Sequence, residues 1–379
     1  MSRTIRLLYA SLLLLVMGIS LLSCSSDTGN NAGGPGQTGT KTAGKRRLIF
    51  LTNVEDPFWD TCKAGLLEGE KVFELEADGL TVVMDKNNQK AEGQINKLRQ
   101  YGTESDVAGV AISVIQADNK AIATEMRNLQ AKGIPVITVD GDVNREKYRD
   151  ARKFYIGTDN HTGGITLGTA GKKLLESRDI KSGGYVQFVG FTDNDNARAR
   201  MNGFKEAVGE AYSEKDRMAD GSDRGKAREN VRIAIDKNPD DLVALVGIWA
   251  YNAPAIAQVA EERKIGDKVA VATFDAAEDA IGEMGKGNID VMVVQNPFDM
   301  GMQTVKLLKA MVKKDEAVVK EMFPTADQPE GDIYTTGLRV VVPDDESPIK
   351  ADLFDAKTVE FMTLPQFQAW LAKYNLKSS

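Results

Sequence analysis

The sequence predicts an α/β fold made of two doubly wound, parallel-sheet lobes. From Lys45 onward, short apolar runs rich in β-branched residues alternate with amphipathic stretches of helical length, a pattern typical of parallel strands joined by helices. Most of the runs are continuously apolar, as expected for strands covered by helices on both faces. About nine strands in 379 residues fit two sheets better than one.

The elements follow one another in regular order along the body of the chain. We expect strands at residues 48–52, 80–84, 107–113, 136–140, 154–157, 185–189, 243–249, 269–274 and 291–295. We expect helices at residues 58–75, 91–101, 117–132, 162–175, 199–208, 253–263 and 300–311, with a further helix at 364–374 in the tail.

Composition excludes several classes of protein. The net charge of -7 provides no basic excess for nucleic acid, so we expect no such partner. The single histidine, His161, argues against a histidine-rich metal site and against a Ser/His/Asp relay. We expect no metal and no cofactor.

The amino terminus predicts export and lipid anchoring. Arg3 and Arg6 precede an apolar run at residues 7–22, which is shorter than a membrane-spanning helix requires and fits a signal peptide. The run ends in Leu-Leu-Ser-Cys, which resembles a bacterial lipobox and implies a diacylated Cys24. Residues 25–44 are rich in Ser, Gly, Thr and Asn, as in a flexible tether. The alternative is an ordinary signal peptide that happens to contain a cysteine.

The second cysteine, Cys62, lies in an amphipathic stretch with Trp59, Leu66 and Phe73. A free cysteine in such a stretch is usually a small buried hydrophobe, so we interpret it as a core residue rather than a reactive thiol.

Polar and aromatic residues follow the predicted strands, at the edge where parallel sheets bind ligands. Carboxylates and amides there accept from hydroxyl groups, cationic and amide nitrogens donate to them, and aromatic rings cover apolar faces of a sugar. The acceptor candidates are Asp56, Asp140 and Asp275; the donors are Arg198, Asn252 and Gln295; the rings are Phe58, Trp59, Trp249, Tyr251 and Phe274. Each also has an ordinary structural interpretation as a helix cap, a core residue or a solvated charge.

Other motifs fail. Gly164, Gly168 and Gly171 precede Lys172, but the spacing is not that of a phosphate-binding loop, so we expect this face to pack close to the sheet. The acidic run beginning at Asp193 lacks the glycine and the final carboxylate of a calcium loop. Paired carboxylates for glycoside hydrolysis have no supporting spacing, yet remain an open alternative.

Taken in order, the strand-end segments resemble those of the ribose/galactose-type periplasmic binding proteins of ABC transporters, over residues 47–343. Asp-Pro-Phe-Trp at 56–59 is similar to the Asn-Pro-Phe-Phe element of that family, and Pro-Val-Ile-Thr-Val-Asp at 135–140 to its Pro-Val-Ile-Thr-hydrophobic-Asp. Gly141 stands where the ribose group often has arginine. Further similar segments are Ala-Arg-Ala-Arg-Met-Asn-Gly-Phe at 197–204, Ala-Tyr-Asn-Ala at 250–253, Phe-Asp at 274–275 and Gln-Asn-Pro at 295–297.

The resemblance implies a set of ligand-binding residues. They are Asp56, Phe58, Trp59, Ser113, Asp140, Arg198, Tyr251 or Asn252, Asp275 and Gln295. It also implies a hinge crossed three times, near residues 157–159, 295–296 and 335–338. The implied parts are a signal peptide (1–23), a tether (24–44), lobe one (45–157 and 296–335), lobe two (158–295 and 336–345) and a C-terminal extension (346–379).

The implied function is capture of a monosaccharide or related polyol by a monomeric receptor, held to a membrane in the periplasm or at the cell surface and serving an ABC permease. A signalling receptor of the same fold and a lipid-anchored glycosidase are the alternatives. The export signal argues against a transcription factor.

Overall fold

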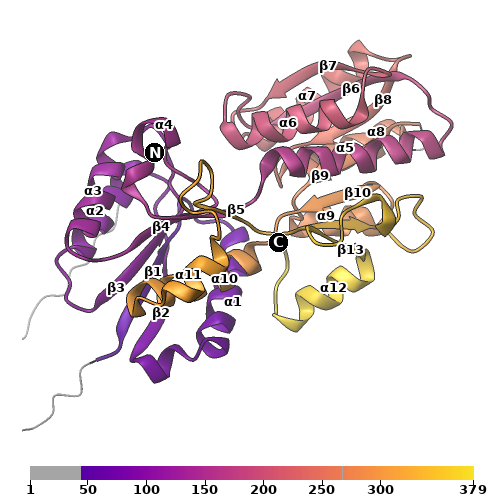
Figure 1. Ribbon diagram of the computed structural model, residues 1–379. Coiled ribbons are helices and arrows are strands. Elements are labelled where there is room, and N and C mark those ends of the chain that lie inside the picture. The colour runs from indigo at the N-terminus through magenta and orange to yellow at the C-terminus, as the bar shows by residue number, and fades with distance from the viewer. Residues whose placement is uncertain (1–43, 267) are drawn as a thin grey trace, which may run out of the picture. The chain divides into compact units, whose positions relative to one another are not determined.

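The computed structural model describes residues 44–266 and 268–379, which form two α/β lobes around two separate sheets (Figure 1). This confirms the predicted fold class. The predicted signal peptide, Cys24 and all of the predicted tether except Gly44 lie outside the described residues.

The first lobe is built on a six-stranded parallel sheet of order β11-β5-β4-β3-β1-β2. Its strands are β1 (Arg46–Leu51), β2 (Leu80–Asp85), β3 (Val107–Ile112), β4 (Val136–Val139), β5 (Tyr155–Gly157) and β11 (Ile333–Thr335). Its helices are α1 (Phe58–Val72), α2 (Ala91–Tyr101), α3 (Lys120–Ala131), α4 (Arg145–Tyr148), α10 (Pro297–Lys313) and α11 (Glu316–Met322), with short 3-10 turns at Leu75–Asp78 and Arg149–Ala151.

Alternation along β1 shows why its last four residues, 48–51, are all apolar. Leu48 and Phe50 point to one face, where they pack against α1 and α10. Ile49 and Leu51 point to the other face, against α2 and α3. Both sets are buried, so residues 48–51 need apolar side chains at every position. Cys62 is fully buried in the first of these clusters, as predicted, and burial raises the pKa of its thiol.

The second lobe has a seven-stranded sheet of order β13-β12-β10-β9-β8-β6-β7. Its strands are β6 (Gly183–Val189), β7 (Tyr212–Ala219), β8 (Leu242–Gly247), β9 (Ala270–Phe274), β10 (Val291–Val294), β12 (Leu338–Val342) and β13 (Val359–Thr363). Its helices are α5 (Asn160–Ser177), α6 (Asp195–Val208), α7 (Arg224–Lys237), α8 (Asn252–Arg263), α9 (Glu278–Gly285) and α12 (Leu364–Lys373), with a 3-10 turn at Ala351–Leu353. One core cluster lies under α5 and α6, and the other under α7, α8, α9 and α12.

The chain passes between the two sheets between β5 and α5, between β10 and α10, and between β11 and β12. The sheets are parallel except where β12 pairs antiparallel with β10. The tail does not stand apart from the lobes. Its strand β13 pairs with β12, and Phe367 of α12 is fully buried in the second lobe.

The small-residue face of α5 packs closely, but against α6 and not against the sheet as predicted. A Cβ atom at Gly164 would lie 2.1 Å from the carbonyl oxygen of Arg200, and one at Gly168 would lie 2.6 Å from that of Phe204. Glycine at these positions therefore brings α5 against α6, backbone to backbone. This contact fixes the position of the helix that carries Arg200.

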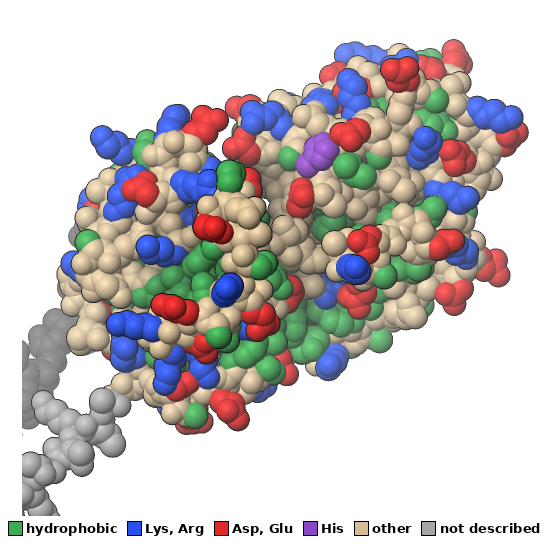
Figure 2. Space-filling view, in the orientation of Figure 1, with side chains coloured by type: hydrophobic (Ala, Val, Ile, Leu, Met, Phe, Trp, Pro, Cys, Tyr) green, Lys and Arg blue, Asp and Glu red, His purple; other side chains and the backbone are tan. Residues whose placement is uncertain are grey.

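Acidic and basic side chains are interspersed over both lobes on the face drawn in Figure 2. Among the described residues, none of the helices has both the length and the hydropathy needed to cross a bilayer.

Candidate functional site

In the first lobe, the end of β4 presents a carboxylate. Asp140 directly follows this strand and has a φ of 61°, the left-handed region that Asp and Asn tolerate better than most residues. Its backbone N–H donates to Ile156 O at 2.9 Å, and its carbonyl accepts from the Tyr155 hydroxyl at 3.1 Å. Both partners belong to the neighbouring strand β5, so the sheet itself fixes the orientation of Asp140.

Ser113 supports the same carboxylate from the end of β3. Its hydroxyl lies 3.5 Å from Asp140 Oδ2 and accepts from the backbone N–H of Gly141 at 3.1 Å. A Cβ atom at Gly141 would lie 2.6 Å from Val114 O and 2.9 Å from Ser113 Oγ. This crowding explains why no larger side chain follows Asp140 in this chain.

In the second lobe, the end of β9 presents another carboxylate. Asp275 follows β9, has a φ of 63° and is 7% exposed. Gln295 Nε2 donates to Asp275 Oδ1 at 3.0 Å, and Thr158 Oγ1 donates to Gln295 Oε1 at 2.8 Å. Thr158 and Gln295 belong to two of the segments that connect the lobes, so Asp275 is hydrogen-bonded into the hinge.

The cation of the site is Arg200, on α6. Its side chain is almost fully buried, with Nε donating to Asn160 Oδ1 at 2.9 Å and Nη1 to Ile248 O at 3.2 Å. Nη1 also lies 3.4 Å from Asp275 Oδ2, and the guanidinium carbon is 3.9 Å from the centroid of the Phe274 ring. A desolvated stack of this kind is worth about 2 kcal/mol, so the planar group is held on its face as well as at its edge.

The three charges act on one another across the lobes. Burial raises the pKa of Asp140 to about 6, with Arg200 opposing the rise and Asp275 adding to it. Burial also raises the pKa of Asp275, against the opposing effect of Arg200. The pKa of Arg200 is lowered by burial, an effect that the two carboxylates oppose. The cluster is thus short of positive charge, and it suits a neutral ligand with many hydroxyl groups better than an anion.

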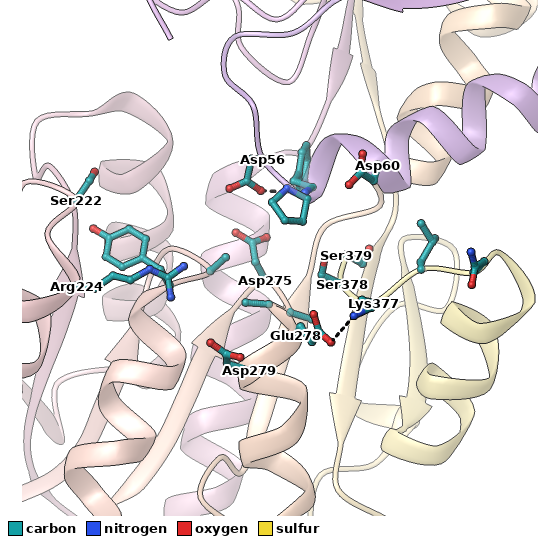
Figure 3. A pocket seen from close by; sticks show the side chains of 18 residues that line it. Asp56, Asp60, Ser222, Arg224, Asp275, Glu278, Asp279, Lys377, Ser378 and Ser379 are labelled. Carbon is teal, nitrogen blue, oxygen red and sulfur yellow. Dashed lines mark hydrogen bonds and ion pairs between the residues drawn. The ribbon is translucent and has the colours of Figure 1, made fainter. Parts of the chain in front are cut away.

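A cavity of about 480 Å³ adjoins this cluster (Figure 3). It is lined by residues 56–58 at the start of α1, by Tyr251, by residues 275–279 after β9 and by residues 375–379 of the tail. Asp275 belongs both to the charge cluster and to the cavity wall. The cavity therefore has walls from both lobes, as the two-lobe prediction requires.

Most of the residues predicted from sequence come together here. Asp56, Phe58, Tyr251 and Asp275 line the cavity. Ser113 is paired with Asp140 in the first lobe, and Gln295 is hydrogen-bonded to Asp275 in the second. Trp59 does not line the cavity. It is 2% exposed in the core of the first lobe, against Phe50, and its Nε1 donates to Asn53 Oδ1 at 3.1 Å.

The structure places Arg200, and not the predicted Arg198, beside Asp275. Arg198 is exposed and pairs with Asp195, one turn earlier in α6. The buried face of α6 carries Ala197, Met201 and Phe204, and helical spacing puts Arg200 on that face and Arg198 off it. This periodicity was the signal in the sequence that separates the two arginines.

Sequence reasoning also missed Asp220, which is 2% exposed beyond the end of β7. Its carboxylate accepts from the Tyr251 hydroxyl, from Asn252 Nδ2 at 2.9 Å and from the backbone N–H of Ser222 at 2.8 Å. Asn252 is fully buried, and its role is to hold Asp220 and the turn after β8, where its Oδ1 accepts from Trp249 N at 3.1 Å. Of the two alternatives left open, Tyr251 is the one that reaches the cavity wall.

Comparison with known proteins places this geometry in a family. The chain is 26% identical to the D-allose-binding periplasmic protein of Escherichia coli over 290 residues, which is 73% of this chain and 87% of that protein. It is 21% identical to a ribose import binding protein of Bacillus subtilis, covering 67% of this chain and 77% of that protein.

Solved structures agree on the fold. A solute-binding protein of an ABC transporter from Burkholderia graminis, in complex with D-arabinose, superposes with a TM-score of 0.65 at 22% identity, covering 82% of this chain and 99% of that one. A periplasmic solute-binding protein from Actinobacillus succinogenes with bound D-allose gives 0.66 at 17% identity, covering 80% and 99%. The family model described as periplasmic binding protein domain matches residues 48–316. With two α/β lobes, three connecting segments and a cavity between the strand ends, this chain belongs to the periplasmic binding protein domain family.

Proposed function

We propose that this protein binds a small sugar in the cavity between its lobes and delivers it to an ABC permease. The observation that carries the proposal is the cluster of half-buried Asp140 with buried Arg200 and Asp275, two carboxylates and one guanidinium beside a cavity large enough for a monosaccharide. The names of the relatives, which bind allose and import ribose, support a sugar as the ligand class.

The chemistry of the cluster fits hydroxyl groups. A sugar hydroxyl donates to a carboxylate and accepts from a guanidinium, and such charge-assisted bonds are stronger than neutral ones. Phe58, half-buried on the cavity wall, offers an apolar surface to the C–H face of a sugar ring. Asp56 is partly engaged already, because its Oδ1 accepts from the backbone N–H of Phe58 at 2.9 Å, which orients that ring.

Delivery requires that the bound ligand stabilise one arrangement of the two lobes over the others. Asp140 belongs to the first lobe and Asp275 to the second, so a ligand contacting both stabilises the arrangement in which the two walls face one another. A permease that recognises this arrangement would receive only loaded protein. We expect a monomer that releases its ligand unchanged, without turnover.

Cys24 and residues 25–43 lie outside the described residues, so lipid anchoring rests on the sequence pattern alone. We propose that a diacylated Cys24 holds the receptor to a membrane at a raised local concentration beside its permease. Mass spectrometry of the purified mature protein should find two acyl chains on Cys24. Cys24→Ser should move the protein into the soluble fraction, and wild-type protein found there without lipid would contradict the anchor.

A binding screen tests the ligand. Calorimetry with D-allose, D-ribose, D-arabinose and uncharged polyols should show one-site saturable binding for at least one of them, and chromatography of the same mixtures should recover the sugar unaltered. Conversion of the sugar would favour the glycosidase alternative. An absence of binding across pentoses and hexoses would refute sugar capture.

A further inference from the structure

The end of the chain returns to the candidate site. After α12, residues 375–379 run along the second lobe to the loop that follows β9. There Ser379 N donates to Ala276 O at 3.1 Å, and Ala276 N donates to Ser379 O at 3.0 Å. Ala276 directly follows Asp275, so the tail is paired with the backbone beside a carboxylate of the charge cluster.

The same segment also contacts the first lobe. Thr61, fully buried on α1, donates its hydroxyl to Ser378 O at 2.8 Å. This bond joins the helix that begins at the cavity to the residue before Ser379. One short piece of backbone is thus hydrogen-bonded to both lobes within two consecutive residues.

A second contact between the lobes lies just before this segment. Phe298, at the start of α10 in the first lobe, packs 4.4 Å from the Tyr374 ring and 5.8 Å from the Trp370 ring, measured between centroids. Trp370 belongs to α12 and is covered on one face by Arg339, 4.1 Å from its centroid. This aromatic group anchors the tail where it leaves the helix.

Residues 375–379 form part of the cavity surface, together with Asp56 and Phe58. Ser378 and Ser379 lie near Asp275 in Figure 3. Ser378 and Ser379 are 8% and 4% exposed, and Ser379 Oγ is buried without a hydrogen-bond partner. A segment without regular secondary structure loses conformational entropy when it is ordered in this way, and here the order comes from contacts with both lobes.

We propose that residues 375–379 are a fixed wall of the ligand cavity that also ties the two lobes together, so that this segment determines how tightly a ligand is enclosed. The hydrogen bonds between this segment and the two lobes do not depend on which ligand is bound, whereas the effect on affinity rests on the proposed sugar-binding function. Because the tail bonds to both lobes only when they face one another as here, it stabilises the arrangement that encloses the ligand.

The variants for the test are Thr61→Val and a chain lacking residues 375–379. Valine keeps the shape of threonine and removes the hydroxyl that donates to Ser378. The matched control is Thr304→Val, because Thr304 is also a buried helical threonine of the first lobe, but its hydroxyl donates to Met300 O within its own helix. All variants carry Cys24→Ser for solubility.

Two readouts are needed. Fluorescence energy transfer between dyes on the exposed positions Lys132 and Lys237, one on each lobe and each replaced by cysteine, reports lobe separation without any ligand. Calorimetry with D-allose and D-arabinose reports affinity. We expect both variants to show a longer mean distance between the dyes or a broader distribution of distances. Binding of the sugar should be about fivefold weaker in Thr61→Val and at least about tenfold weaker in the deletion variant. Thr304→Val should match wild type in both readouts.

Unchanged separation and unchanged affinity in the deletion variant would overturn the proposal. If the deletion impairs folding, as judged by circular dichroism, Thr61→Val decides the question by the same criteria. If wild-type protein binds no sugar, the proposed function fails, while the separation of the dyes still decides whether the tail ties the lobes.

Discussion

Arg200 Nη1 lies 3.4 Å from Asp275 Oδ2, and the guanidinium carbon of Arg200 lies over the ring of Phe274, the residue before Asp275, at 3.9 Å from its centroid. The end of β9 therefore supplies both Asp275, which contacts the edge of the guanidinium, and Phe274, which contacts its face. The guanidinium is held further by Asn160, at the start of α5, which accepts from Nε, and by the carbonyl of Ile248, just after β8, which accepts from Nη1. This relationship makes Arg200 the residue on which sugar binding should depend most.

Replacing each arginine of α6 by lysine tests that dependence. Arg200→Lys keeps the charge but loses the stack on Phe274 and the fork that reaches Asn160 and Ile248. We expect the affinity for sugar to fall by at least about 2 kcal/mol, roughly thirtyfold, as measured by calorimetry. Arg198→Lys, on the exposed face, should bind like wild type. Equal losses in the two variants would contradict the assignment.

Asp140→Asn should raise stability while it weakens binding. The pKa of Asp140 is raised from 3.8 to about 6, so between these values the folded chain holds a proton that the unfolded chain releases. The free energy of unfolding therefore falls as pH rises through this window, and ionised Asp140 costs stability above it. Asparagine removes that cost and tolerates the same backbone.

Thermal unfolding measures this effect. At about pH 8 the Asp140→Asn protein should be more stable by about 1–3 kcal/mol, and the gain should shrink to zero as pH approaches the ordinary carboxyl value. Asp193→Asn, at an exposed position on the same lobe as Arg200, is the control and should show no such trend. A destabilised Asp140→Asn protein at neutral pH would be evidence against a buried, costly carboxylate.

The affinity for sugar should itself depend on pH. A hydroxyl donates to the ionised carboxylate, so a proton on Asp140 competes with the ligand. Below about pH 6 we expect the affinity to fall by up to about tenfold per unit of pH, and above it to be constant. Calorimetry across this range provides the test, and Asp140→Asn should abolish the dependence. A flat profile in wild type would show that Asp140 does not accept from the ligand in its ionised form.

Asp220 should act through Tyr251. Removing its carboxylate in Asp220→Ala leaves the Tyr251 hydroxyl and the buried Asn252 amide without their shared acceptor. We expect a loss of about 1–3 kcal/mol in stability together with weaker sugar binding, from thermal unfolding and calorimetry. Tyr251→Phe keeps the ring and should retain most of the affinity. If Tyr251→Phe loses as much affinity as Asp220→Ala, the hydroxyl itself contacts the ligand.

Strand and helix prediction succeeded where the sequence pattern reports burial directly. All nine predicted strands are present, because the strands buried on both faces need apolar residues at every position. β7 escaped prediction because it is an edge strand with mostly polar, partly exposed residues, and β11 because it has three residues. β12 and β13 were also missed, although β12 is fully buried. The polar helix α7 was missed for a similar reason, having few buried positions.

By itself the sequence determined the fold class, the strand ends that adjoin the cavity and most of the residues that gather there, since local periodicity fixes strands and parallel strands place their ends together. Only the tertiary structure placed Tyr251 rather than Asn252, and Phe58 rather than Trp59, on the cavity wall. These choices depend on which face of a helix or turn is buried against another element. The contact of Thr61 with Ser378 joins residues 317 positions apart, and no local pattern records such a meeting.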